Sequence, residues 1–268
     1  MTQIRPAAVA GSFYPGQATT LARDLEHYLA GAPAAVGPCP KAVIVPHAGY
    51  VYSGPIAAQA YRRLAGARGQ IQRVVLLGPV HRVPVRGLAL SGASAFETPL
   101  GRVAIDSAAY TPLTDLPQVV MSDAAHAMEH SLEVQLPFLQ TVLGEFKLVP
   151  LAVGDATPAE VAAVLERLWG GPETLIVISS DLSHYLPYGE AQKIDAHTAD
   201  MILHLKVGVT HEQACGGTPV NGLLLAASHH HLRPELLDLR NSGDTAGDPA
   251  HVVGYAAFAF SEDDHAQH

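Results

Sequence analysis

Three short apolar segments of this 268-residue chain each lead into a histidine. The pairs of segment and histidine are Val43–Val45 with His47, Val74–Leu77 with His81, and Leu175–Ile178 with His184. Short runs of Val, Ile and Leu are typical of strands buried on both faces, as in a mostly parallel sheet. Parallel strands end at a common edge, where ligands of open α/β folds bind. We therefore expect three imidazoles that are distant in sequence to converge in space.

Helical and strand-like patterns alternate along the rest of the chain, which predicts an α/β fold. Apolar spacing and capping signals predict helices over 21–31, 53–64, 132–143, 157–168, 194–205 and 219–232. Further strands are predicted over 87–91, 102–106, 147–153, 236–240 and 252–260. Pro137 is expected to kink its helix. The expected architecture is a three-layer sandwich: a mixed, mostly parallel central sheet with helices on both faces. We expect one domain over residues 1–260 and a disordered acidic tail over 261–268.

Charge and composition disfavour two classes of partner. The formal net charge is −9, so the phosphate backbone of nucleic acid would be repelled. No apolar stretch reaches the roughly 18 residues of a membrane span, and the first residues lack the apolar core of a signal peptide. Two cysteines, Cys39 and Cys215, do not form a disulfide framework. We expect a cytoplasmic protein that binds neither nucleic acid nor membrane.

The surroundings of the three histidines favour a ligand site over isolated structural roles. His47 is followed by Gly49, which permits close approach of the backbone, and by two tyrosines, Tyr50 and Tyr52. Tyr50 and Tyr52 are expected to line the pocket. His184 lies three residues after Asp181, which is expected to accept the second ring N–H of His184 and to orient it.

Cys215 is the candidate for a third metal ligand beside His47 and His81. It precedes a predicted helix, and a helix N-terminus lowers the pKa of a thiol and favours the thiolate that binds metals. Two imidazoles and a thiolate suit zinc, Cu(I) or Fe(II) and not magnesium or calcium. Three protein ligands leave an open position, which is typical of a reactive site. His184 would then act as a base or a hydrogen-bond donor over that position.

A second motif gives a competing interpretation. His126, Glu129 and His130 fit H-x-x-E-H, in which two helical histidines bind zinc and the glutamate is the base of a peptidase. The pattern lies at the beginning of the predicted 132–143 helix and not within it, and no third ligand is evident downstream. We rank a zinc peptidase below the strand-end site.

Taken together, these segments resemble the Memo family, in particular its prokaryotic members called AmmeMemoRadiSam system protein B. The matching segments are 6–15, 46–50, 77–81, 129–139, 179–184, 215–216, 241–245 and 252–257, and they span nearly the whole chain. The resemblance implies a fold similar to that of class III extradiol ring-cleaving dioxygenases (the LigB-like fold). It implies metal ligands at His47, His81 and Cys215, and pocket residues at Asp181 and His184. It also implies partners of the radical-SAM and Ammecr types.

One departure from the related dioxygenases shapes the expected chemistry. Those enzymes hold Fe(II) with two histidines and a carboxylate, whereas Cys215 occupies the third position here. A thiolate is softer and more easily oxidised, which disfavours aromatic ring cleavage. We expect a redox or oxygen-activating enzyme that uses Fe(II) or copper, with zinc on purification as a further outcome. The alternative is a non-catalytic module that binds metal or peptide.

Roles within the site follow from this hypothesis. His184 and Asp181 are the expected catalytic residues. Phe13 and His130, from two of the matching segments, join Tyr50 and Tyr52 as expected substrate-binding residues. The substrate is an unidentified small molecule or peptide.

Overall fold

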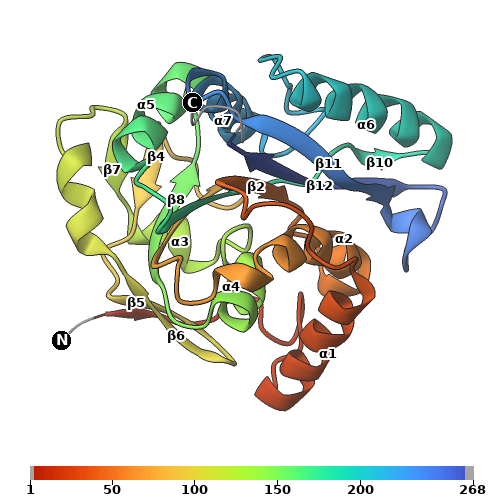
Figure 1. The fold of residues 1–268 in the computed structure, drawn as a ribbon, viewed down its shortest axis with the longest axis horizontal. Coiled ribbons are helices and arrows are strands. Elements are labelled where there is room, and N and C mark those ends of the chain that lie inside the picture. Colours follow the sequence, from red (N-terminus) through yellow and green to blue (C-terminus); the bar gives the residue numbers. More distant parts are fainter. Residues whose placement is uncertain (1–2, 263–268) are drawn as a thin grey trace.

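A twelve-stranded mixed sheet organises residues 3–262, the part of the chain that the computed structural model describes (Figure 1). Nine strands follow the order β1-β5-β6-β8-β3-β9-β2-β12-β10; β11 pairs with β12, and β4 pairs with β7 and β8. The strands are β1 Ile4–Arg5, β2 Ala42–Val45, β3 Arg73–Pro79, β4 Leu88–Leu90, β5 Ala95–Thr98, β6 Gly101–Ile105, β7 Val119–Met121, β8 Lys147–Val153, β9 Thr174–Ser179, β10 His184–Leu186, β11 Arg233–Asn241 and β12 Val252–Ser261.

The centre of the sheet is parallel. Strands β6, β8, β3, β9 and β2 pair in parallel, whereas β12 joins β2 in the antiparallel sense, as β11 joins β12 and β5 joins β6. The register pairs Val45 of β2 with Ser179 of β9. Because β3, β9 and β2 are neighbours, the segments that follow them emerge side by side at one edge. The prediction of a mixed, mostly parallel sheet is confirmed.

Helices cover both faces of the sheet. Helices α1, α2 and α4 lie on one side, and α5, α6 and α7 lie on the other (Figure 1). The helices are α1 Ala18–Gly31, α2 Tyr50–Arg63, α3 Asp123–Ala127, α4 Leu136–Leu143, α5 Pro158–Leu168, α6 Tyr188–Leu203 and α7 Gly217–His229. Short 3-10 helices span Ala65–Ala67, Ser107–Leu113, Glu133–Gln135 and Ser242–Asp244.

The alternation of side chains along the buried strands separates two apolar cores. Val43 and Val45 of β2 pack in the core with α1, α2 and α4, whereas Ile44 packs in the core with α5 and α7. Successive side chains of a strand point to opposite faces, so a continuous aliphatic run supplies both cores. This pattern confirms the predicted three-layer sandwich.

Two local predictions were wrong. Helix α2 begins at Tyr50 and not at Ser53, and it contains Pro55. Pro137 stands at the start of α4, where a missing N–H costs nothing, so it begins the helix and does not kink it. The first change affects the site, because the first turn of α2 turns Tyr50 inward to the core.

The predicted tail falls mostly outside the described residues. Strand β12 includes Ser261, so the sheet extends one residue past the predicted domain boundary. Residues 263–268 lie outside the described residues. Among residues 3–262, no helix has both the length and the apolar character required to span a membrane.

Candidate metal centre

His47 follows β2 and is held on two sides. Its backbone N–H donates to Oδ1 of Asp181 (2.7 Å), and its Nδ1 lies 2.9 Å from Oγ of Ser179, the last residue of β9. The ring is 2% exposed. Burial, together with the nearby rings of His130 and His81, holds the pKa of His47 well below its usual value. The ring is therefore neutral, the form that binds metals.

His81 follows β3 and contacts a buried carboxylate. Its backbone N–H donates to Oε2 of Glu129 (2.5 Å), and its Nδ1 lies 2.9 Å from Oε1 of the same residue. Burial alone would raise the pKa of Glu129, but hydrogen bonds from His81 and backbone N–H groups outweigh it and lower the pKa to about 2. Glu129 is thus an ionised acceptor that ties the segment after β3 to the segment after α3.

His130 completes a cluster of three imidazoles. The ring centroids of His47 and His81 are 5.3 Å apart, those of His47 and His130 are 5.4 Å apart, and those of His81 and His130 are 4.6 Å apart. One ring nitrogen from each residue lies within 4.8 Å of the other two. Phe13 packs against His130 with a centroid distance of 4.6 Å. Imidazole nitrogens in this arrangement fit zinc, copper or iron.

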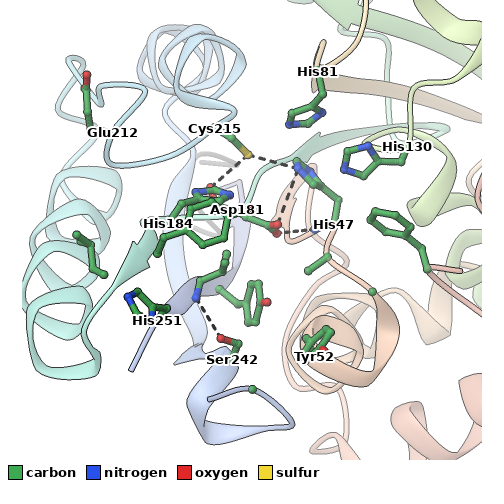
Figure 2. A pocket seen from close by; sticks show the side chains of 18 of the residues that line it. His47, Tyr52, His81, His130, Asp181, His184, Glu212, Cys215, Ser242 and His251 are labelled. Atoms are coloured by element: carbon green, nitrogen blue, oxygen red, sulfur yellow. Dashed lines mark hydrogen bonds and ion pairs between the residues drawn. The ribbon is translucent and has the colours of Figure 1, made fainter. Parts of the chain in front are cut away.

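Cys215 reaches the same cluster from the segment before α7. Its Sγ lies 3.3 Å from Nε2 of His47, and its thiol contacts the backbone carbonyl of Asp181 at 3.7 Å (Figure 2). The next residue must be small, because a Cβ on Gly216 would meet Cβ of Ser180 at 2.6 Å. A glycine there lets the Cys215 segment pass close to the end of β9.

The expected effect of helix α7 on this thiol was wrong. Burial, with the negative charge of Asp181, raises the pKa of Cys215 to about 12. Desolvation opposes formation of the thiolate more strongly than the hydrogen bonds of Ser180 and of the Gly216 backbone favour it. Binding of a cation would therefore displace a proton from Cys215.

Asp181 and His184 do not form the predicted pair among the described hydrogen bonds. The Asp181 carboxylate accepts from the backbone of His47, and its Oδ2 lies 3.9 Å from Nε2 of His47. His184 begins β10 and lines the cavity, where its ring contacts that of Tyr185 edge to face at 5.8 Å. Asp181 therefore positions the backbone of His47, while His184 lines the cavity beside the cluster.

The cluster forms one wall of a cavity of about 1030 Å³. Phe13, Tyr52, His184 and Tyr255 contribute to the other walls, and Figure 2 shows Tyr52 and His184 on different sides of the space. Tyr50 is not in this wall: it is 3% exposed and donates its hydroxyl to the carbonyl of Val134 in the core. Of the described residues that line the cavity, none is Lys or Arg.

The H-x-x-E-H motif divides between two parts of the molecule. His126 lies in α3 and its Nε2 contacts the carbonyl of Ala89 at 2.9 Å, while its ring packs on Phe96. His130 lies beyond the end of α3 and turns to His47 and His81. Because the helix ends between them, the two rings do not share a ligand position, and the peptidase interpretation was wrong.

Some functional contacts escaped the sequence analysis. His130 was assigned to substrate binding, yet its ring belongs to the imidazole cluster. Ser179 and Glu129 contact the rings of His47 and His81, and neither was predicted to do so. The signals for them were their places in segments that match the family and, for Glu129, its place in the H-x-x-E-H motif.

The fold and this site define a class: an α/β sandwich that carries a clustered-histidine candidate metal centre at the carboxyl edge of its parallel strands. A crystal structure of an uncharacterized protein from Escherichia coli K12 shares the fold, with a TM-score of 0.50 and 14% identity, and the match covers 81% of this chain and 98% of that one. This likeness concerns the fold alone.

Comparison of sequences then specifies the family. The family model described as Memo-like protein matches residues 5–259. A MEMO1 family protein of Ignicoccus hospitalis is 38% identical, covering 96% of this chain and 98% of the relative. One from Aquifex aeolicus is also 38% identical, covering 96% and 99%. The chain belongs to the Memo family.

Proposed function

We propose that this Memo-family protein binds Fe(II) or copper and acts as a redox or oxygen-activating enzyme. The observation that carries the proposal is the convergence of His47, His81 and His130, with ring nitrogens within 4.8 Å of one another, beside Cys215 and a large cavity. Two or three imidazoles and a soft sulfur suit these ions. When bound, the ion would supply one-electron redox chemistry.

The residues of the chain have separate tasks in this proposal. His47, His81 and Cys215 hold the ion, and the geometry adds His130 as a fourth candidate ligand. His184 accepts or donates a proton at a ring nitrogen facing the cavity. Phe13 and Tyr52 give the substrate an aromatic surface and exclude water from part of the cavity. The substrate remains a small molecule or peptide without an assigned structure.

The metal content of variants tests the ligand set. We expect His47→Ala, His81→Ala and Cys215→Ser each to lower the affinity for iron or copper by more than about tenfold, because each removes a donor atom. His184→Ala should retain the metal and change reactivity. Elemental analysis of anaerobically purified protein measures this, with His126→Ala as a buried control outside the cluster. Full metal retention in the Cys215 variant would remove the thiol from the ligand set.

Adding His130→Ala to the series distinguishes a ligand from a substrate-binding residue. If His130 ligates the ion, this variant loses metal as the His47 variant does. If it retains metal, the ring belongs to the substrate wall. Oxygen consumption by the metal-loaded protein in the presence of candidate substrates then tests turnover. Bound metal without turnover would favour the alternative, a non-catalytic metal- or peptide-binding module.

Two wider proposals accompany this function and rest on family resemblance and composition. One is association with radical-SAM and Ammecr-type proteins, tested by purification of the three proteins together. The other is a cytoplasmic location, tested by fractionation of cells.

A further inference from the structure

The hydroxyl of Ser179 has three hydrogen-bonding neighbours, and counting the available protons shows which of these groups donate. Its hydroxyl has one proton, and the carbonyl of Ser131 lies 2.6 Å from Oγ as an obligatory acceptor. Nε2 of Gln135 donates to the same Oγ at 2.8 Å. The third neighbour is Nδ1 of His47 at 2.9 Å. Because Oγ already donates its single proton to the carbonyl of Ser131, it can only accept a hydrogen bond from this nitrogen. Nδ1 of His47 must carry a proton and donate it.

The neighbours of the Gln135 amide fix its orientation, so Nε2 of Gln135 is the group that donates to Ser179. The hydroxyl of Tyr61 donates to Oε1 of Gln135 at 2.7 Å, and the Nε2 group donates its other hydrogen to the carbonyl of Pro46 at 2.9 Å. A flipped amide would place Oε1 against the Pro46 carbonyl, where no proton is available. Tyr61, Gln135 and Ser179 are buried, so water does not substitute for these partners.

Glu129 likewise requires a protonated Nδ1 on His81, in this case through a carboxylate and not a hydroxyl. Its Oε1 lies 2.9 Å from Nδ1 of His81 and accepts hydrogen bonds from the backbone N–H groups of His130 and Ser131, also at 2.9 Å. Its Oε2 receives the backbone N–H of His81. An ionised carboxylate has only acceptors to offer, so Nδ1 of His81 is the donor. The carboxylate is 1% exposed, which keeps the arrangement dry.

We infer that Ser179 and Glu129 are positioning residues that lock His47 and His81 in the Nδ1–H tautomer before any metal binds, leaving both Nε2 atoms bare. The inference builds on the proposed function, since the bare nitrogens are the proposed donors. Nε2 of His47 points to Sγ of Cys215, as this state requires. An ion then meets nitrogens that need no change of tautomer. Such outer hydrogen bonds commonly change metal affinity about 10- to 100-fold.

The tautomers are measurable in the metal-free wild-type protein. Histidine side-chain ¹⁵N NMR, recorded where both rings are neutral, should show a protonated Nδ1 and an unprotonated Nε2 for His47 and His81. Loss of each signal set in His47→Gln and His81→Gln assigns the rings. A protonated Nε2 in either ring would overturn the inference. This measurement needs no metal, so it stands or fails separately from the proposed function.

Zinc affinity gives a second test with a matched pair of serines. We expect Ser179→Ala to weaken binding of zinc alone about 10- to 100-fold. Ser183 is a buried serine four residues away whose Oγ has no hydrogen-bond partner in the described structure. Ser183→Ala should change zinc affinity less than about twofold. Equal affinities of the two variants would contradict the role of Ser179.

A matched pair of carboxylates tests the other positioning residue. Glu129→Gln should weaken zinc binding about 10- to 100-fold, because an amide cannot accept from all four N–H groups. Glu129→Asp keeps the charge and should recover part of the affinity. Asp106→Asn changes another buried carboxylate, which pairs with Arg73 at the opposite end of β3, and should leave zinc affinity of the folded protein within about twofold. Wild-type affinity in Glu129→Gln would overturn this part of the inference.

Discussion

Glu129 and Glu133 are two buried carboxylates only four residues apart, yet they serve different parts of the molecule. Glu129 accepts hydrogen bonds from His81 and from the backbone of His130, so it shapes the candidate metal centre. Glu133 accepts hydrogen bonds from Arg5, from the backbone N–H groups of Ala8 and Val9, and from the hydroxyl of Tyr14. It therefore fixes the N-terminal segment. Their residue type, burial and segment are the same. The partners alone distinguish a site residue from a structural one.

The comparison also shows how the two regions are joined. Arg5 pairs with Glu133 and donates to the backbone carbonyls of His126 and Glu129. The N-terminal segment therefore supports the turn that presents His130, and it carries Phe13 against that ring. Arg5 uses Nε and Nη2 for these two carbonyls and Nη1 for Glu133, so its bonds to the turn do not pass through the Glu133 carboxylate.

The largest expected effect is a loss of stability on changing Glu133, the carboxylate that fixes the N-terminal segment. Glu133→Gln leaves the buried Arg5 without a counter-charge, and breaking such a pair commonly costs about 3–5 kcal/mol of stability. Urea unfolding of the metal-free protein measures the loss. Metal content per folded molecule should stay near that of the wild type. If this variant folds fully but loses its metal, the separation of the two carboxylates breaks down.

A smaller effect is the pH dependence of stability that His126 contributes, a buried residue that packs on Phe96 outside the cluster. Burial lowers the pKa of His126 to about 4 from 6.5, and its Nδ1 has no hydrogen-bond partner in the described structure. Between these values the unfolded chain binds the extra proton, so stability falls as pH decreases from 6.5 towards 4. The contribution is at most about 3 kcal/mol.

The matched variant isolates this contribution. His126→Gln should flatten that part of the stability–pH curve, since it removes the titrating ring and keeps a group that can donate to the carbonyl of Ala89. Urea unfolding at a series of pH values gives both curves. Parallel curves for wild type and variant would show that His126 is not the source.

The smallest expected effect is at Cys39, which belongs to neither region. Its side chain is exposed, and it lies in the loop before β2, away from the cluster. Cys39→Ser should change stability by less than about 0.5 kcal/mol and leave metal content unchanged. Metal analysis and urea unfolding of the same preparation check both statements. A clear loss of metal would mean that the sulfur of Cys39 takes part in binding.

Much of the sheet was predictable from sequence because its strands are continuous aliphatic runs. The segments before His47 and His81 need burial on both faces, and β2 and β3 provide it. The beginning of α2 was missed because Tyr50-Val51-Tyr52 is consistent with either a strand or a first helical turn. Pro137 was misplaced for a related reason, since a proline inside an apolar helical pattern predicts a kink unless the start of the helix is known.

Topology predicted the part of the candidate site that follows strands, whereas Cys215 was predicted from its place before a helix and from the family resemblance. His47 and His81 follow β2 and β3, two parallel strands separated by β9 alone, so their approach was inferred from topology. His130 comes from an irregular segment, which has no such rule. The contact of His47 with Ser179 joins residues 132 positions apart, and that of His81 with Glu129 joins residues 48 positions apart. Side-chain hydrogen bonds of this range depend on tertiary packing that one sequence does not specify.

The order β3-β9-β2 has a consequence for how the protein matures. His47 and Ser179 come together only after β9 has inserted between β3 and β2, both of which precede β9 in the chain. A nascent chain that has completed β3 holds both histidines but no scaffold to align them. The two histidines are therefore aligned only once these central strands have assembled, and loading of the proposed metal is expected to follow that assembly.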